Sequence, residues 1–227
     1  MTAPAFRILF VIYPRMTQLD FTGPHQFLSR LPGSETLVAS PAGGAVHADG
    51  LVFGDTLPIA EVDRCDLICI PGGGGATEVS QDQAFLDEVR RLAGGARYVT
   101  SVCTGSLVLG AAGLLRGKRA TTHWAWHDLL PLFGATPVAE RVVRDGNTIT
   151  GGGVTAGIDF ALAVLAELAG VETAQAIQLG LEYAPAPPFA AGSPETAPAA
   201  VLARVRANNA KAAPKRRAEA EAAAARL

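Results

Sequence analysis

A cysteine lies where a strand pattern gives way to a helix pattern. The stretch Ser101-Val102-Cys103-Thr104-Gly105-Ser106 joins a predicted strand at Arg97–Val102 to a predicted helix at Thr104–Leu115. A nucleophile on such a sharp turn, with small residues two positions before and after it, is typical of a nucleophile elbow. The N–H groups and dipole at a helix start favour the thiolate, which is the reactive form of cysteine. We therefore predict that Cys103 is a nucleophile; the alternative is a buried cysteine that packs as a small apolar residue.

Glycine clusters follow two other segments that read as strands. The run Gly72–Gly75 comes directly after the apolar segment Asp66–Ile70, and Gly151–Gly153 precedes a predicted helix. Glycine lets the backbone pass close to another group, and two amides such as those of Gly72 and Gly73 can hold negative charge on a reacting atom. A phosphate-binding loop would need a Lys and a Ser or Thr after the glycines, and neither follows here.

A carboxylate follows the first predicted strand, Phe6–Tyr13, in the segment Leu19-Asp20-Phe21-Thr22-Gly23-Pro24. The carboxyl ends of parallel strands meet at one edge of a sheet, where ligands bind. Asp20 could therefore face the same crevice as Cys103. It could equally be the N-cap of the next helix, and both interpretations stay open.

Two histidines, His123 and His127, are four residues apart in H-W-A-W-H. That spacing can hold zinc, but the Glu of the H-E-x-x-H motif and an evident third ligand are missing. We predict no metal site and favour packed or hydrogen-bonded roles for both rings. His123 could act as a base for Cys103, although the chemistry does not require it.

Short, continuous apolar segments alternate with amphipathic ones along the chain. Continuous hydrophobicity indicates strands that are buried on both faces, as in a parallel sheet covered by helices. The predicted strands are Phe6–Tyr13, Thr36–Ser40, Asp66–Ile70 and Arg97–Val102, with a minor hairpin arm at Leu51–Thr56 and a hairpin over residues 141–150. The predicted helices are Asp20–Leu31, Asp82–Ala93, Thr104–Leu115, His123–Phe133, Val154–Ala169 and Val171–Glu182. Pro41–Gly50 reads as turns. This alternation predicts an α/β fold with a doubly wound, mostly parallel sheet and helices on both faces.

The end of the chain differs in composition from the rest. Residues 185–198 form a Pro-rich loop, and an Ala-rich segment with several basic residues runs from Ala199 to the C-terminus. We expect this tail to be helical, with its charges on a solvated face. No segment reads as a linker, so we predict one domain over residues 1–227.

Composition excludes several classes of protein. The chain has 227 residues, 19 Lys and Arg and 21 Asp and Glu, for a formal net charge of −2. A near-neutral balance argues against a nucleic-acid partner, and no apolar run reaches the ~18–20 residues that cross a bilayer. Three cysteines do not suggest a disulfide framework and fit a reducing cytoplasm.

Four motifs together resemble a known family. They are V-T-S-V-C-T-G-S-L-V-L-G-A-A-G-L-L around Cys103, P-G-G-G-G at 71–75, L-D-F-T-G-P at 19–24 and A-T-T-H-W at 120–124. In this order they resemble the PfpI-type branch of the class I glutamine amidotransferase-like superfamily, which implies a flavodoxin-like fold. Thr104 stands where the peptidase-like members carry His after the cysteine, which argues against a protease. With E-Y-A-P-A-P-P-F-A-A-G-S-P downstream, the sequence is most similar to the isonitrile hydratases.

The resemblance implies hydration of an isonitrile to an N-substituted formamide, with no metal or organic cofactor, in a homodimer. Cys103 would then attack the isonitrile carbon and form a thioimidate. Asp20 would act as general acid and later activate water. Thr104 would position both groups, and the amides of Gly72 and Gly73 would polarise the intermediate.

Three other functions stay open. A glyoxalase or deglycase of the same superfamily would use the same thiol and carboxylate and should also need His123. The N-terminal half of certain AraC-type regulators shares the D-x-x-G-P and C-T-G features and would sense a ligand, but such a protein would also need a helix-turn-helix domain. A redox sensor would oxidise Cys103 to a sulfenic or sulfinic acid.

Overall fold

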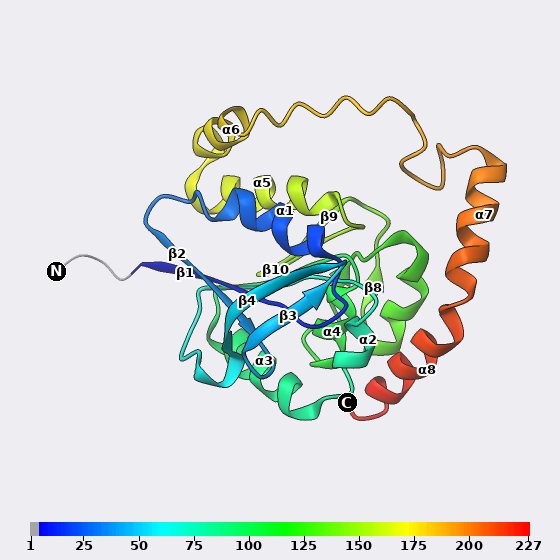
Figure 1. The fold of residues 1–227 in the computed structure, drawn as a ribbon, viewed down its shortest axis with the longest axis horizontal. Coiled ribbons are helices and arrows are strands. Elements are labelled where there is room, and N and C mark those ends of the chain that lie inside the picture. Colours follow the sequence, from blue (N-terminus) through cyan, green and yellow to red (C-terminus); the bar gives the residue numbers. More distant parts are fainter. Residues whose placement is uncertain (1–4) are drawn as a thin grey trace.

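A twisted sheet of eight strands forms the centre of the computed structural model, which describes residues 5–227 (Figure 1). The strands follow one another across the sheet in the order β3-β4-β2-β1-β5-β6-β10-β9. Their bounds are β1 Phe6–Val11, β2 Ser34–Ser40, β3 Gly44–Ala48, β4 Leu51–Pro58, β5 Leu67–Ile70, β6 Tyr98–Val102, β9 Val142–Asp145 and β10 Thr148–Gly151. The six inner strands are parallel, and only the two edge strands run antiparallel to their neighbours. The predicted α/β fold with a mostly parallel sheet is confirmed.

Helices cover both faces of the sheet. The helices are α1 Gln18–Leu28, α2 Ala76–Val79, α3 Gln83–Gly95, α4 Gly105–Ala111, α5 Ala156–Ala169, α6 Val171–Gly180, α7 Ala199–Ala210 and α8 Ala213–Ala224. In Figure 1, α1, α5 and α6 lie on one side of the sheet, and α2, α3, α4 and α8 lie on the other. Every residue of β5 is buried, as the continuous apolar pattern predicted.

The order of the strands brings three sequence motifs together at the carboxyl ends of the central strands. Strands β1, β5 and β6 are neighbours, and they end at Val11, Ile70 and Val102. The segments that hold Asp20, the glycine run and Cys103 follow these three ends. Strand β10 lies next to β6 and adds the segment after Gly151.

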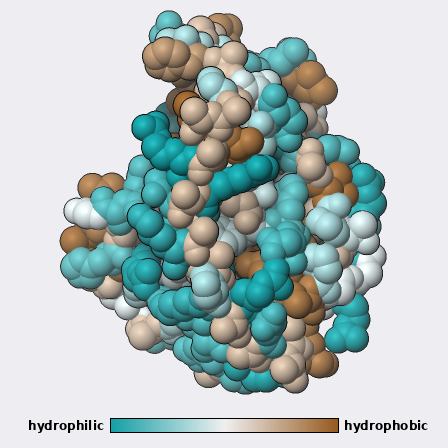
Figure 2. Space-filling model, turned by 90° about the vertical axis from the view of Figure 1, so that its right-hand side faces the viewer, coloured by the Kyte–Doolittle hydropathy of each residue, from teal (hydrophilic) through white to brown (hydrophobic). Residues whose placement is uncertain are grey.

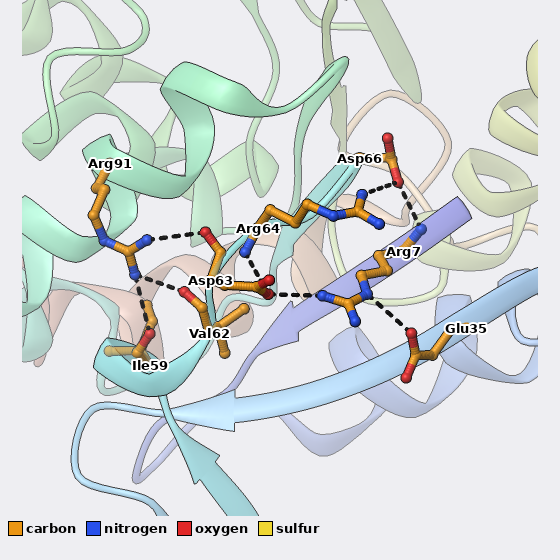
Figure 3. Close-up of polar contacts among 8 residues, drawn as sticks. All are labelled: Arg7, Glu35, Ile59, Val62, Asp63, Arg64, Asp66 and Arg91. Carbon is orange, nitrogen blue, oxygen red and sulfur yellow. Dashed lines mark hydrogen bonds and ion pairs between the residues drawn. The ribbon is translucent and has the colours of Figure 1, made fainter. Parts of the chain in front are cut away.

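Ion pairs connect the segments at the N-terminal ends of β1, β2 and β5 (Figure 3). The Arg7 backbone N–H donates to Asp66 Oδ2 at 2.8 Å, and its guanidinium pairs with Glu35 and Asp63 at 3.0 and 2.7 Å. Arg91 donates to the carbonyl oxygen of Val62 at 2.8 Å. Such solvent-exposed pairs contribute little to the stability of a fold. This cluster is therefore structural and lies away from the strand ends that carry the motifs.

Four sequence expectations need correction. His123–Phe133 is a 3-10 helix, η2 (Trp124–Phe133), and Pro131 near its end has no N–H to donate. The helix after Cys103 ends at Ala111, and Gly113 at φ +75° turns the chain beyond it. The turn-rich segment 41–50 contains strand β3, which pairs with β4. The tail is two helices, because the chain breaks at residues 211–212, and Pro214 lies in the first turn of α8.

A long segment without regular structure connects α6 to α7 along the outside of the molecule (Figure 1). Phe189 in it is 79% exposed. Helix α7 buries none of its residues, whereas α8 buries Ala220 and Ala223 against the body of the protein. Figure 2 shows this side of the molecule, where hydrophilic and hydrophobic residues are interspersed. None of the helices in residues 5–227 is long and apolar enough to cross a membrane.

Candidate active site

Cys103 occupies a strained turn between β6 and α4. Its φ is +56°, in the left-handed region that non-glycine residues rarely adopt. Its N–H donates to the carbonyl oxygens of Gly151 and Gly152 at 3.0 and 2.9 Å, which fixes the turn to the end of β10. A Cβ at Gly105 would lie 2.0 Å from the carbonyl oxygen of Ile70, so only glycine fits there. The nucleophile elbow predicted from the sequence is therefore present.

Asp20 lies in the first turn of α1 with its side chain fully buried. Its Oδ2 accepts a hydrogen bond from the Gly72 N–H at 3.1 Å, and Oδ1 has no hydrogen-bonding partner in residues 5–227. The carboxyl also interacts with the Cys103 thiol. It caps no N–H of its own helix, so the N-cap interpretation is wrong. The structure instead brings Asp20 and Cys103 together.

Burial dominates the electrostatics of this pair. It raises the pKa of Asp20 to about 7, against the lowering effect of the Cys103 thiol and the Gly72 N–H. It also raises the pKa of the Cys103 thiol, and the Asp20 charge adds to that effect. The N–H groups of Val154 and Thr104 act in the opposite direction. The start of the short helix α4 does not outweigh burial, so a thiol paired with a carboxylate is favoured over a free thiolate.

The glycine loop holds the other site groups in place. The Gly73 N–H donates to Thr104 Oγ1 at 2.8 Å, and that hydroxyl donates to the Gly73 carbonyl oxygen at 3.1 Å. The Gly72 N–H is bonded to Asp20. Both amides therefore already have partners, and they orient Asp20 and Thr104. The sequence predicted that these two amides would be free to bind an intermediate, and that prediction is wrong.

A cavity of about 350 Å³ opens against the backbone of Gly152–Val154, the segment that also holds Cys103. Its walls include Thr122, His123 and Trp124, together with residues 192–195 of the outer segment. Thr122 Oγ1 donates to the Cys103 carbonyl oxygen at 3.0 Å. The cavity therefore adjoins the elbow and has room for a small organic group.

Both histidines of the H-W-A-W-H motif have structural partners. His123 Nδ1 accepts from the Ala125 N–H at 3.2 Å, and burial lowers the pKa of its ring. His127 Nε2 lies 3.1 Å from the Thr122 carbonyl oxygen and 3.3 Å from Thr121 Oγ1. Over residues 5–227, no group of three or more His, Cys, Asp or Glu side chains could hold a metal ion.

Three residues at the site were missed from the sequence. Tyr13 is buried, and its hydroxyl donates to the Pro71 carbonyl oxygen at 2.5 Å. Val154 directs its N–H toward the Cys103 sulfur with φ at +27°, and the adjacent glycine cluster was its only signal. Arg216 of α8 donates to the Gly73 carbonyl oxygen at 3.3 Å. It is more than a hundred residues from Cys103 along the chain, and the sequence holds no signal for it.

Comparison with known proteins gives consistent matches. The DJ-1/PfpI family model matches residues 6–167. The isonitrile hydratase of Pseudomonas putida is 56% identical over 203 residues, which are 89% of each chain. Drosophila melanogaster protein dj-1beta is 29% identical over 76% of this chain and 95% of its own. A crystal structure of a ThiJ/PfpI family protein from Pseudomonas syringae superposes with a TM-score of 0.91 at 40% identity, over 97% of this chain and 90% of that one.

Proposed function

We propose that this chain, which belongs to the DJ-1/PfpI family, is an enzyme that hydrates isonitriles to N-substituted formamides. The observation that carries this proposal is the buried Cys103–Asp20 pair at the strand ends, in a chain 56% identical to an isonitrile hydratase. The pair offers a nucleophile and a proton donor in one place. The adjoining cavity offers room for the substituent on the isonitrile nitrogen.

In the first step, the Cys103 sulfur attacks the isonitrile carbon and a C–S bond forms. The thiol proton passes to Asp20, and Asp20 delivers it to the same carbon. The product is a thioimidate, Cys103–S–CH=N–R. Because Asp20 has a pKa of about 7, it can both accept and release this proton near neutral pH.

In the second step, water adds to the thioimidate carbon. Asp20 accepts one proton of the water as it attacks and passes it to the thioimidate nitrogen. The C–S bond then breaks, the hydroxyl proton of the intermediate passes to the Cys103 sulfur, and the formamide R–NH–CHO leaves. Substrate and product are both neutral, so no charged clamp is needed to bind either.

Thr104 and the two glycines act by positioning. The Gly72 N–H orients the Asp20 carboxyl, and the Thr104 hydroxyl bonds to both polar groups of Gly73. The N–H groups of Val154 and Thr104, which face the sulfur, would stabilise negative charge on it. We further propose a homodimer in the cytoplasm, where the three unpaired cysteines would remain thiols.

The assay that tests this function measures an N-arylformamide formed from an aryl isonitrile, with methylglyoxal as the competing substrate. We expect formamide to form and methylglyoxal to remain. Conversion of methylglyoxal without conversion of the isonitrile would instead assign the chain to the glyoxalase type. Loss of neither substrate would favour a thiol sensor.

The pair must hold a single proton for the first step to begin, which predicts a pH dependence. Below the Asp20 pKa of about 7 both groups are protonated, and Asp20 cannot accept the thiol proton. We expect kcat/KM to fall about tenfold for each pH unit below that value. Measurements from pH 5 to pH 9, corrected for hydrolysis of the isonitrile without enzyme, check this. A constant kcat/KM down to pH 5 would contradict the shared-proton mechanism.

Gly72→Ala should inactivate the enzyme, while Gly74→Ala should not. A Cβ at Gly72 would lie 2.4 Å from the Thr104 nitrogen and 2.8 Å from both Asp20 Oδ2 and Cys103 Cβ. The same atom at Gly74 would meet only Arg15, at an ordinary 3.5 Å. Because displacements of about 1 Å cost about 100-fold in rate, we expect kcat/KM to fall at least that far for Gly72→Ala. Equal kcat/KM values for the two variants would show that the loop does not set the site geometry.

A further inference from the structure

One arginine of the C-terminal helix reaches the active site. Arg216 Nη2 donates to the Gly73 carbonyl oxygen at 3.3 Å, and the Thr104 hydroxyl donates to that same oxygen. Its guanidinium carbon lies 4.4 Å from the centre of the Trp126 ring, over which it stacks. The side chain therefore bridges α8, η2 and the glycine loop.

The neighbours of Arg216 on α8 behave differently. Lys215 pairs with Glu78 and Glu219, and Arg217 pairs with Asp128 and Glu221, all near the surface. Within residues 5–227, Arg216 forms no ion pair. Its Nη1 is buried without a hydrogen-bonding partner. Arg216 as a whole is partly buried, and a partly buried guanidinium without a carboxylate partner is costly unless a nearby group carries compensating negative charge.

The groups that carry such charge belong to the active site. Arg216 interacts electrostatically with Cys103 and Tyr13, and both act to raise its pKa against the effect of burial. In return, its charge lowers the pKa of Tyr13 and of His123. The negative charge of Asp20 in α1 acts to raise the pKa of Tyr13 and of Cys103. The remaining charged groups that act on Arg216 are Glu219 of its own helix and Arg15 after β1.

We propose that Arg216 is a positioning residue of the active site, whose guanidinium holds the Gly73–Thr104 contact and whose positive charge stabilises negative charge on Cys103. Helix α8 then completes the catalytic centre. The sequence had predicted instead that the charges of this tail lie on a solvated face. This proposal rests on Cys103 as the nucleophile of the proposed function.

The test measures the alkylation rate of Cys103 by iodoacetamide as a function of pH, followed by mass spectrometry of the Cys103 peptide. A nearby opposite charge lowers the pKa of an acidic group by about 1–3 units. We expect Arg216→Met to displace the rate–pH curve by about one unit to higher pH, a tenfold lower rate at each pH below the midpoint. Arg216→Lys keeps the charge, so we expect a displacement below half a unit. The matched control Arg217→Met should leave the curve unchanged.

Each outcome decides the proposal. No displacement in Arg216→Met, or equal displacements in Arg216→Met and Arg217→Met, would overturn it. Equal displacements in Arg216→Met and Arg216→Lys would show that stacking on Trp126 matters and charge does not. Thermal melts and Trp fluorescence check that α8 stays in place, and Arg216→Gln repeats the test if the Met variant unfolds. Alkylation needs no isonitrile, so its result is independent of the substrate assay.

Discussion

Cys103→Ser is expected to abolish isonitrile hydration while leaving the fold intact. Serine has nearly the shape of cysteine and can occupy the same turn at φ +56°. Its hydroxyl is a far weaker nucleophile at neutral pH, and Asp20 with its pKa of about 7 is too weak a base to activate it. We expect kcat to fall at least about 1,000-fold, as it does when a catalytic nucleophile is removed from an enzyme.

Cys65→Ser is the matched control for this experiment. Cys65 is also a free, buried thiol, but it lies before β5, at the opposite end of that strand from the glycine loop. Burial raises the pKa of Cys65 to about 12, and its position before β5 keeps it away from Asp20, the proposed proton acceptor. We expect Cys65→Ser to retain full turnover. Retained turnover in Cys103→Ser, with a melting temperature like that of the parent protein, would exclude covalent catalysis by this thiol.

Asp20→Asn is expected to slow turnover by about 100- to 10,000-fold, the usual contribution of a general acid or base. The amide keeps the shape of the carboxyl and can still accept the Gly72 N–H. It cannot take the thiol proton or deliver it to carbon. A turnover number within threefold of the parent value would remove Asp20 from the mechanism.

The same substitution should stabilise the protein above neutral pH. Burial raises the folded-state pKa of Asp20 from 3.8 to about 7, so ionisation favours the unfolded chain. The stability that Asp20 contributes is therefore present below pH 3.8 and is lost as the pH rises through about 7. At 1.36 kcal/mol for each unit, Asp20→Asn should gain up to about 4 kcal/mol at pH 8.

Urea unfolding of the parent and Asp20→Asn proteins at pH 4.5 and pH 8 measures this gain. We expect the difference in unfolding free energy to be small at the lower pH and large at the higher one. An equal difference at both pH values would show that the buried carboxyl does not carry the cost of ionisation.

Local patterns predicted the sheet and the elbow because both depend on neighbouring residues. Continuous apolar segments such as Asp66–Ile70 led to buried strands, and the small residues around Cys103 led to the turn. Segments whose structure depends on one residue were less predictable. Pro131 interrupts the hydrogen bonding of η2, and Gly113 at φ +75° shortened the helix after Cys103.

The site was predictable where strand ends converge and unpredictable where distant segments meet. The carboxyl ends of β1, β5 and β6 brought together Asp20, the glycine run and Cys103, as the order of the motifs indicated. The state of the thiol depends on burial in three dimensions, which the helix-dipole argument alone did not include. Arg216 reaches the glycine loop only because α8 packs back onto α2 and α4.

The most direct test of isonitrile hydration through Cys103 is acid quenching of the protein during turnover of an aryl isonitrile, with the mass of the Cys103 peptide measured alongside the formamide. The mechanism predicts an adduct of one isonitrile mass on that peptide, present only during turnover and in proportion to the rate of formamide release. It also predicts that Cys103→Ala forms neither the adduct nor the formamide. Formamide production at the parent rate by Cys103→Ala would contradict a covalent thioimidate on this cysteine.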